Sequence, residues 1–249
     1  MGLMSPAEPY YRPDLALVHH EGFGFHADRC APGILAVLEP VRARGGLVLE
    51  IGCGSGRLTR HLLDAGHRVV ATDASEAMLD LARRTAPDAV DIHRLTLPDD
   101  PVPAADAIVS VGHALSYLDD VPAVERALGA LALALRPGGV LALDLCDLRW
   151  AEAHQDGRVV AQVSDNWAII SRAHVPDPDH YVREMTTFVR VGDGWRRDDE
   201  RHVNVLLDTS RVPALLMAHG IDAVVGRSFG AESLPDGLFT VIGRRPAEG

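Results

Sequence analysis

A glycine-rich segment is the part of the sequence whose residue types and spacing point most directly to chemistry. It reads EIGCGSG over residues 50–56 and lies between an apolar run and a segment with leucines at helical spacing. Glycines between a buried strand and a helix let the backbone turn sharply and approach a ligand closely. Asp73 ends the next apolar run, where a carboxylate can accept hydrogen bonds from both hydroxyls of a ribose. The pattern predicts a site for a nucleoside-containing cofactor.

Two cofactor classes use such a loop, and the neighbouring residues distinguish them. A dinucleotide site has the spacing G-x-G-x-x-G with a pyrophosphate at the helix N-terminus, and here Arg57 stands where the third glycine belongs. Glu50 would also repel an anionic pyrophosphate, whereas its carboxylate suits a cationic amino-acid group. The residues favour a cationic cofactor, and a nicotinamide dinucleotide stays the alternative.

The elements that must position this loop alternate between strand and helix. Strands are predicted in residues 47–51, 67–73, 89–95, 106–114 and 140–145, with helices between them and a turn in the RPGG of residues 136–139. Ser75 is expected to cap one of these helices. About five alternations of this kind are typical of a parallel, doubly wound sheet.

The two ends of the chain differ from this central part. A helix is predicted over residues 14–38, with a break at residues 22–24. Residues 159–175, 180–207 and 239–245 are rich in strand formers, residues 192–194 (GDG) form a hairpin turn, and residues 210–220 form a helix. We expect one domain: a helical lid (1–45), a core (46–147) and a β-rich elaboration (148–249).

Residues 46–147 resemble the class I S-adenosylmethionine (SAM)-dependent methyltransferases. The matching segments are LEIGCGSGRLTRHLLDAGHRVVATDASEAML, DIHRLTLP, DAIVSVGHALSYL and ALRPGGVLALDL, in the order and spacing of that family. The resemblance implies a doubly wound, mostly parallel, seven-stranded Rossmann-like α/β sheet. The β-rich C-terminal segment would supply its late antiparallel strand, and the N-terminal helices would form the lid.

The resemblance also implies roles for individual residues around SAM. Gly52, Gly54 and Gly56 would wrap the methionine portion, Glu50 would orient the loop and the ammonium group, and Asp73 would bind the ribose. Many relatives have Gly-Asp-Ala after the third strand, but this chain has RLT at residues 94–96, so Thr96 or backbone groups would take the place of the usual Asp at adenine. Further cofactor contacts are implied for Tyr11, Cys53, Ala74, Met78, Leu95, Thr96, Val111 and Gly112.

His113 is the candidate for a catalytic base. Methyl transfer from a sulfonium is an in-line displacement, so the protein mainly holds the nucleophile near the methyl group and excludes water. A base is needed only when the acceptor is protonated, and an imidazole at the carboxyl edge of the sheet suits that role. The other interpretation is that His113 only lines the site.

Four residues are candidates for binding the acceptor: His19, Phe23, Tyr117 and His202. The first two belong to the N-terminal lid, where the alternative is that aromatic side chains simply pack the lid onto the core. Strand alternation puts His202 and Asn204 on one face, which either looks over the cofactor or faces solvent. Three arginines nearby are expected to be ordinary solvent-facing residues: Arg183, Arg196 and Arg197.

The composition excludes several other classes of function. All 24 basic residues are arginine, which excludes a Schiff-base lysine, a pyridoxal-phosphate anchor and a P-loop lysine. A net charge of -11 argues against nucleic acid or an anionic membrane as the partner. The histidines lack HxxxH or HExxH spacing, so no metal is expected. Three widely spaced cysteines indicate a reduced, cytoplasmic protein.

The sequence therefore predicts an enzyme that transfers a methyl group from SAM to an oxygen or nitrogen of a small molecule. S-adenosylhomocysteine (SAH) would be the second product, and specialised-metabolite biosynthesis is the expected context. We expect a monomer or homodimer. The alternatives are an NAD(P)-dependent oxidoreductase, a non-catalytic SAM-binding regulatory module, and an enzyme that uses the sulfonium for another outcome.

Overall fold

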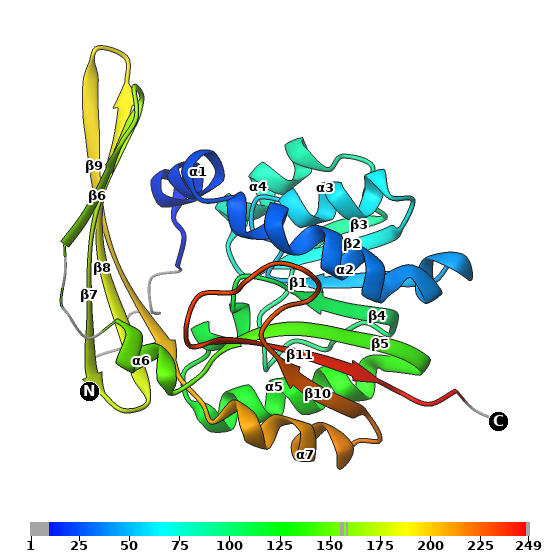
Figure 1. Cartoon of the computed structure of the whole chain (residues 1–249). Helices are drawn as coiled ribbons and strands as arrows, with labels where there is room; N and C mark the ends of the chain where they lie inside the picture. The colour runs from blue at the N-terminus through cyan, green and yellow to red at the C-terminus, as the bar shows by residue number, and fades with distance from the viewer. Residues whose placement is uncertain (1–9, 155–156, 158, 248–249) are drawn as a thin grey trace, which may run out of the picture.

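Two β-sheets form the framework of the computed structural model, which describes residues 10–154, 157 and 159–247 (Figure 1). The larger sheet has seven strands in the order β10-β11-β5-β4-β1-β2-β3. All of its pairings are parallel except those of β11, which runs antiparallel to β5 and β10. The predicted doubly wound, mostly parallel sheet is confirmed. Its strands are β1 (Leu47–Ile51), β2 (Arg68–Asp73), β3 (Asp91–Arg94), β4 (Ala105–Ser110), β5 (Leu135–Cys146), β10 (Asp222–Gly226) and β11 (Leu238–Arg244).

Helices cover both faces of this sheet because its strands are apolar on both sides. On one face, Ile34 and Leu38 of α2 pack with Val48 and Val109 of the sheet. On the other face, leucines of α5 pack against β1 and β5. The first layer contains α2 (Phe25–Ala43), α3 (Arg57–Asp64) and α4 (Glu76–Thr85), and the second contains α5 (Val121–Ala134) and α7 (Val212–Met217).

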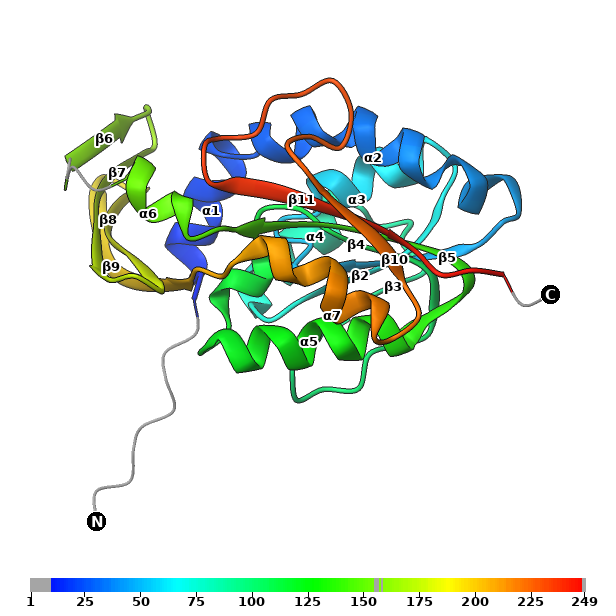
Figure 2. The ribbon, with the colours of Figure 1, turned by 60° about the horizontal axis from the view of Figure 1, so that its bottom comes forward.

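The smaller sheet stands beside the larger one, with helix α1 (Pro13–Gly22) between it and the core (Figure 2). It is antiparallel throughout, in the order β6-β7-β8-β9. Leu15 and Val18 of α1 pack against Trp167, Ile169 and Met185, so the N-terminal helix is held by the β-rich segment. The strands are β6 (Val159–Val163), β7 (Trp167–Asp177), β8 (His180–Val191) and β9 (Gly194–Val205).

Several predicted local features are confirmed. The N-terminal helical segment breaks at residues 22–24, although α2 continues to Ala43 instead of ending near residue 38. Ser75 caps α4, since its Oγ accepts a hydrogen bond from the Met78 N–H at 3.2 Å. The hairpin turn between β8 and β9 is present, with Gly192 at a φ of +59°.

Other local predictions were wrong or incomplete. The RPGG segment, predicted as a turn, lies within β5. The register with β4 shifts there from Leu135 to Val140, so the segment forms a bulge in the strand. The helix predicted over residues 210–220 is a 3₁₀ turn (η2, Thr209–Arg211) followed by the short α7. The sequence did not predict α6 (Arg149–Ala153), the 3₁₀ helix η1 (Ala114–Tyr117) or β10.

Within the described part of the chain, none of the helices has the length and apolar character needed to cross a membrane.

Helix α5 offers a matched pair of leucines that tests the packing of the second layer. Leu128 is 1% exposed in the core cluster, whereas Leu133 on the same helix is 73% exposed. We expect Leu128→Ala to lower the free energy of unfolding by about 2–5 kcal/mol because it leaves a cavity. Leu133→Ala should change it by less than about 0.5 kcal/mol. Urea denaturation of both variants measures this, and equal losses would contradict the described packing.

Candidate functional site

A cavity of about 830 Å³ opens at the carboxyl edge of the larger sheet. It lies beside β1 and β4, where the strand order reverses, and this is the position at which doubly wound sheets bind ligands. Its volume falls within the range of about 300–1,000 Å³ that is typical of small-molecule sites.

Backbone geometry explains the glycines of the loop that follows β1. Gly52 and Gly54 have φ values of +67° and +53°, a region that favours glycine. A Cβ on Gly52 would lie 2.4 Å from the Ala114 Cβ, whereas a Cβ on Gly54 would meet nothing within 4 Å and would project into open space. Gly56 does not line the cavity, and its close neighbour is Ala82 of α4. The loop therefore provides a cradle that side chains would fill.

Two buried carboxyl groups stand at this loop. Asp73 accepts hydrogen bonds from the N–H groups of Gly54 at 2.8 Å and Ser75 at 2.9 Å, and burial raises its pKa. Glu50 is 2% exposed, accepts a 2.7 Å hydrogen bond from the Thr59 hydroxyl, and has a pKa raised to about 8 by burial. A cationic ligand beside Glu50 would favour its ionised form.

A third buried acid, Asp144 at the end of β5, shapes the opposite side of the cavity. Its carboxylate accepts hydrogen bonds from the Gly112 N–H at 2.9 Å and the His113 N–H at 2.6 Å, and it bonds His26 Nε2 at 2.9 Å. Burial is the largest single influence on the Asp144 pKa and opposes ionisation, but the hydrogen bond and charge of His26, the charge of His113 and the Gly112 N–H together lower the pKa. Sequence reasoning missed this residue, although a lone acid inside an apolar strand was the available signal.

His113 lies next to the cavity without lining it. Its backbone has a φ of +50°, and its ring stacks on Tyr117 with centroids 5.6 Å apart. Its Nδ1 is buried without a hydrogen-bond partner. Burial, assisted by the charge of Arg183, lowers the pKa of His113 to about 3, so the ring is neutral at physiological pH.

Tyr11 connects the two sheets across the cavity. Its N–H donates to Glu200 Oε2 at 2.8 Å, and its carbonyl accepts a 2.8 Å hydrogen bond from the Ser75 hydroxyl. Its phenol oxygen lies 2.9 Å from that of Tyr117. The backbone holds a φ of +55°, which these bonds on both sides maintain.

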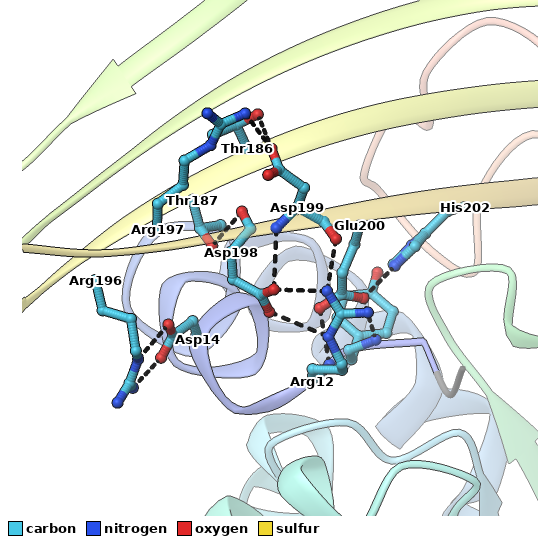
Figure 3. Close-up of polar contacts among 11 residues, drawn as sticks. Arg12, Asp14, Thr186, Thr187, Arg196, Arg197, Asp198, Asp199, Glu200 and His202 are labelled. Atoms are coloured by element: carbon cyan, nitrogen blue, oxygen red, sulfur yellow. Dashed lines mark hydrogen bonds and ion pairs between the residues drawn. The ribbon is translucent and has the colours of Figure 1, made fainter.

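Charged side chains fasten the adjoining N-terminal residues to strand β9 (Figure 3). Glu200 also accepts the Arg12 N–H at 2.8 Å, and the Arg12 guanidinium forms an ion pair with Asp198 at 2.6 Å. Asp14 at the start of α1 pairs with Arg196. The segment from Tyr11 to Asp14 thus lies clamped on the smaller sheet, over the cavity.

The predicted division of β9 into two faces is confirmed. His202 and Asn204 are buried at 0% and 1% exposure, whereas Arg201 is exposed. The expectation that Arg183 faces solvent was wrong: it donates a hydrogen bond to the Tyr117 hydroxyl, and its Nε is buried. The alternation of residues along a strand divides them between two faces of the sheet. It does not show which of the two faces packs against α1 and η1.

Most of the predicted site residues meet around the one cavity. Three of them lie behind its wall, namely Gly56, His113 and His202. The structure adds Ser75, Asp99 and Glu200 to the lining, which sequence reasoning did not single out. The predicted residues that line the cavity are Tyr11, His19, Phe23, Glu50, Gly52, Cys53, Gly54, Asp73, Ala74, Met78, Leu95, Thr96, Val111, Gly112 and Tyr117.

Across residues 10–154, 157 and 159–247, histidine, cysteine and acidic side chains do not gather in any group of three or more that could hold a metal ion.

Comparisons with known proteins agree on a methyltransferase core. Residues 48–139 match the family described as a methyltransferase domain. An uncharacterized methyltransferase of Mycobacterium tuberculosis is 33% identical over 153 residues, which cover 59% of this chain and 58% of that protein. A trans-aconitate 2-methyltransferase of Variovorax paradoxus is 38% identical over 120 residues, 46% of this chain and 44% of that protein. The chain thus spans less than two thirds of these relatives.

Solved structures extend the similarity to the whole fold. The sugar N-methyltransferase KedS8 from a Streptoalloteichus species superposes with a TM-score of 0.79 at 22% identity and covers 99% of both chains. At this identity the match concerns the fold, including the antiparallel sheet beside the core.

The raised pKa of Glu50 predicts a specific pH dependence of stability. Its folded-state pKa is about 8, above the unfolded value of about 4.3, so the folded protein binds more protons between these values. Stability should therefore fall as pH rises from roughly 5 to 8, by up to about 1.4 kcal/mol per pH unit, and level off above. Glu50→Gln should lack this slope.

Urea denaturation of the wild type, Glu50→Gln and the exposed control Glu152→Gln across this pH range measures the effect. The control should follow the wild type. Parallel curves for the wild type and Glu50→Gln would show that Glu50 is ionised at neutral pH in the folded protein.

Proposed function

We propose, on the premise that residues 48–139 belong to the class I SAM-dependent methyltransferase family, that this protein transfers the methyl group of SAM to a small molecule. One observation carries the proposal: the glycine loop, Glu50 and Asp73 all line one cavity. This cavity lies at the carboxyl edge of the sheet between β1 and β4, where the strand order reverses. SAM is the cofactor that the sequence predicted, and it is the cofactor of this family.

The residues present fit this cofactor. Open space above Gly54 and Gly112, where a Cβ would meet nothing within 4 Å, leaves room for a ligand against the backbone. The Asp73 carboxylate accepts N–H groups from Gly54, Ser75 and Ala74, and its two oxygens together offer about four lone-pair sites, so acceptor capacity remains for a ribose hydroxyl. Glu50 offers a buried carboxyl group that a cation would ionise.

When bound, SAM would supply an activated methyl group for the acceptor nucleophile, and SAH would be the product that remains. The chain's own contribution is to position the acceptor and to exclude water from the site. Asp144 fixes the backbone of Gly112 and His113, and the clamped Tyr11 covers the cavity from the other side. These residues would keep the acceptor in place and keep water out of the cavity.

A small-molecule acceptor, methylated at oxygen or nitrogen, is favoured by the residues that cover part of the cavity. Tyr10, Tyr11 and Arg12 line the cavity on the side of the smaller sheet, which suits an enclosed ligand. The named activities of similar proteins, on trans-aconitate and on a sugar nitrogen, also concern small molecules. Specialised-metabolite biosynthesis is the context that we propose.

The environment of His113 limits its capacity to act as a base. Its unpartnered Nδ1 can accept or donate a hydrogen bond, but a conjugate-acid pKa of about 3 makes the ring a weak base. We assign it to orienting the acceptor rather than to removing a proton outright.

Calorimetric titration tests the cofactor. We expect SAM and SAH to bind with dissociation constants in the micromolar range, and Asp73→Ala to weaken both by roughly tenfold to hundredfold because the ribose hydroxyls lose a charged acceptor. The control variant Asp193→Ala, in the exposed turn between β8 and β9, should bind as the wild type does.

NADH is the third titrant in this experiment. Binding of NADH without SAM or SAH would reject the methyltransferase proposal and restore the oxidoreductase. Binding of SAM with no transfer of a radiolabelled methyl group to any compound of a broad acceptor screen would favour the regulatory module.

Variants of His113 test its role once an acceptor is found. We expect His113→Ala to lower kcat roughly tenfold, short of the hundredfold or greater loss typical of a general base, and His113→Gln to restore part of it. The wild-type pH–rate profile should lack a step near pH 6.5 because His113 is already neutral there. Such a step, present in the wild type and lost in both variants, would make His113 the base.

A further inference from the structure

The inner face of the smaller sheet carries a buried polar patch whose hydrogen-bonding capacity is partly unused. Arg183 of β8 lies directly opposite His202 of β9 in the strand register, and Tyr181 lies opposite Asn204. Residues two apart on a strand share a face, so these four residues form one patch, called here the β8–β9 patch. Arg183 donates a hydrogen bond to the Tyr117 hydroxyl, which places the patch against η1.

The positive charge of Arg183 has no carboxylate partner among the described residues. Its side chain is half-buried, its guanidinium donates a hydrogen bond to the phenol of Tyr117, and its Nε is buried with no partner. The other arginines that join this sheet to the N-terminal segment do have carboxylates, Arg12 with Asp198 and Arg196 with Asp14. Since buried charges in proteins are normally paired, Arg183 has the environment of an anion-binding residue.

The groups around Arg183 do not neutralise its charge. Burial, assisted by the charge of Arg183, lowers the pKa of His19 to about 4. Burial also lowers the pKa of His202, although the hydrogen bond to Glu200 acts in the opposite direction. Glu200 already accepts hydrogen bonds from the Tyr11 N–H, the Arg12 N–H and His202. The patch therefore offers an anion one guanidinium with a free donor.

His202 adds a second requirement for a ligand. As a neutral ring beside the Glu200 carboxylate, it donates its Nε2–H to Glu200 Oε2 at 2.8 Å. Its Nδ1 then carries a lone pair, and this atom is buried without a partner. A hydroxyl or amino group is the complementary donor.

We propose that the β8–β9 patch is the acceptor subsite, and that the acceptor carries a carboxylate bound by Arg183 next to a hydroxyl or amino group that donates to His202. This inference rests on the proposed function and names the substrate class. The rings of Tyr10 and Tyr11 cover the patch, with centroids 4.6 Å and 4.9 Å from that of His202, so the acceptor enters when these rings turn aside.

A carboxylate at Arg183 could also come from the methionine portion of the cofactor. The position of the patch favours the acceptor: Tyr11 and Tyr117 line the cavity, whereas Arg183 and His202 lie behind them. The glycine loop and Glu50, where the methionine portion is expected, line the cavity itself.

Thermal unfolding with small probes tests the proposal in the SAH-saturated protein. The probes are glycolate, acetate and glycolamide at equal concentration and ionic strength. We expect glycolate to raise the wild-type Tm by at least about 2 °C, acetate to raise it less, and glycolamide to leave it unchanged. Arg183→Met and Arg183→Gln should lose the response, whereas Arg172→Met on the exposed face of β7 should keep it.

Two further measurements separate a binding role from a structural one. An arginine that awaits an anion should be dispensable for folding, so Arg183→Met or Arg183→Gln should unfold in buffer at the wild-type Tm or above it. Titration with SAH should give the wild-type dissociation constant for both variants.

Several results would overturn the proposal. They are an unchanged wild-type Tm with glycolate, an equal response to glycolamide, a Tm several degrees lower for both Arg183 variants, and weaker SAH binding by those variants, which would assign Arg183 to the cofactor. If the wild type fails to bind SAH at all, the proposed function fails, and this outcome is distinct from the loss of the glycolate response.

Discussion

The structure of the site depends on the backbone of Tyr11, which is held from both sheets at once. Ser75, at the cap of α4, donates to its carbonyl, and Glu200, on β9, accepts its N–H. Ser75 Oγ also accepts the Met78 N–H, and Glu200 also bonds Arg12 and His202. Tyr11, whose backbone is left-handed, thereby joins α4, the helix that follows Asp73, to β9, one of the two strands that carry the β8–β9 patch. Because the strain is balanced by bonds on both sides, the cavity and its cover are positioned together.

Buried acids organise the carboxyl edge of the sheet in different ways. Asp73 and Asp144 are held by backbone N–H groups and fix the loops that bear Gly54 and Gly112. The Glu50 carboxyl group accepts a hydrogen bond from the Thr59 hydroxyl and from no backbone N–H of the described residues, and burial raises its pKa to about 8. A site that leaves one carboxyl group poorly solvated is prepared for a cation, which supports the cofactor that we propose.

The β-rich segment completes the site. Its strands supply Glu200, His202 and Arg183, and its inner face packs on α1. The core alone would leave the cavity without the cover formed by Tyr10, Tyr11 and Arg12, since those residues are fastened to β9. In the function that we propose, the core holds the cofactor and the added sheet selects the acceptor.

The sequence by itself determined the parts of the protein that depend on short stretches of chain. The glycine loop after β1, Asp73 at the end of β2, the cap at Ser75 and the alternation of strand and helix are local patterns, and the structure shows each of them. The strand bounds differ from the predicted ones by a few residues, and Gly56 lies outside the cavity. The resemblance to class I methyltransferases rests on the same stretches, and the match over residues 48–139 confirms it.

Only the tertiary structure decided which distant side chains meet. Glu200 and Tyr11 are 189 residues apart, and Asp144 reaches His113 across 31. No local period contains such pairings, because they depend on how the second sheet packs against α1 and on where β5 ends beside β4. For the same reason the orientation of Arg183 and the low pKa of His113 could not be read from their neighbours in sequence: burial and charge at both positions come from other elements.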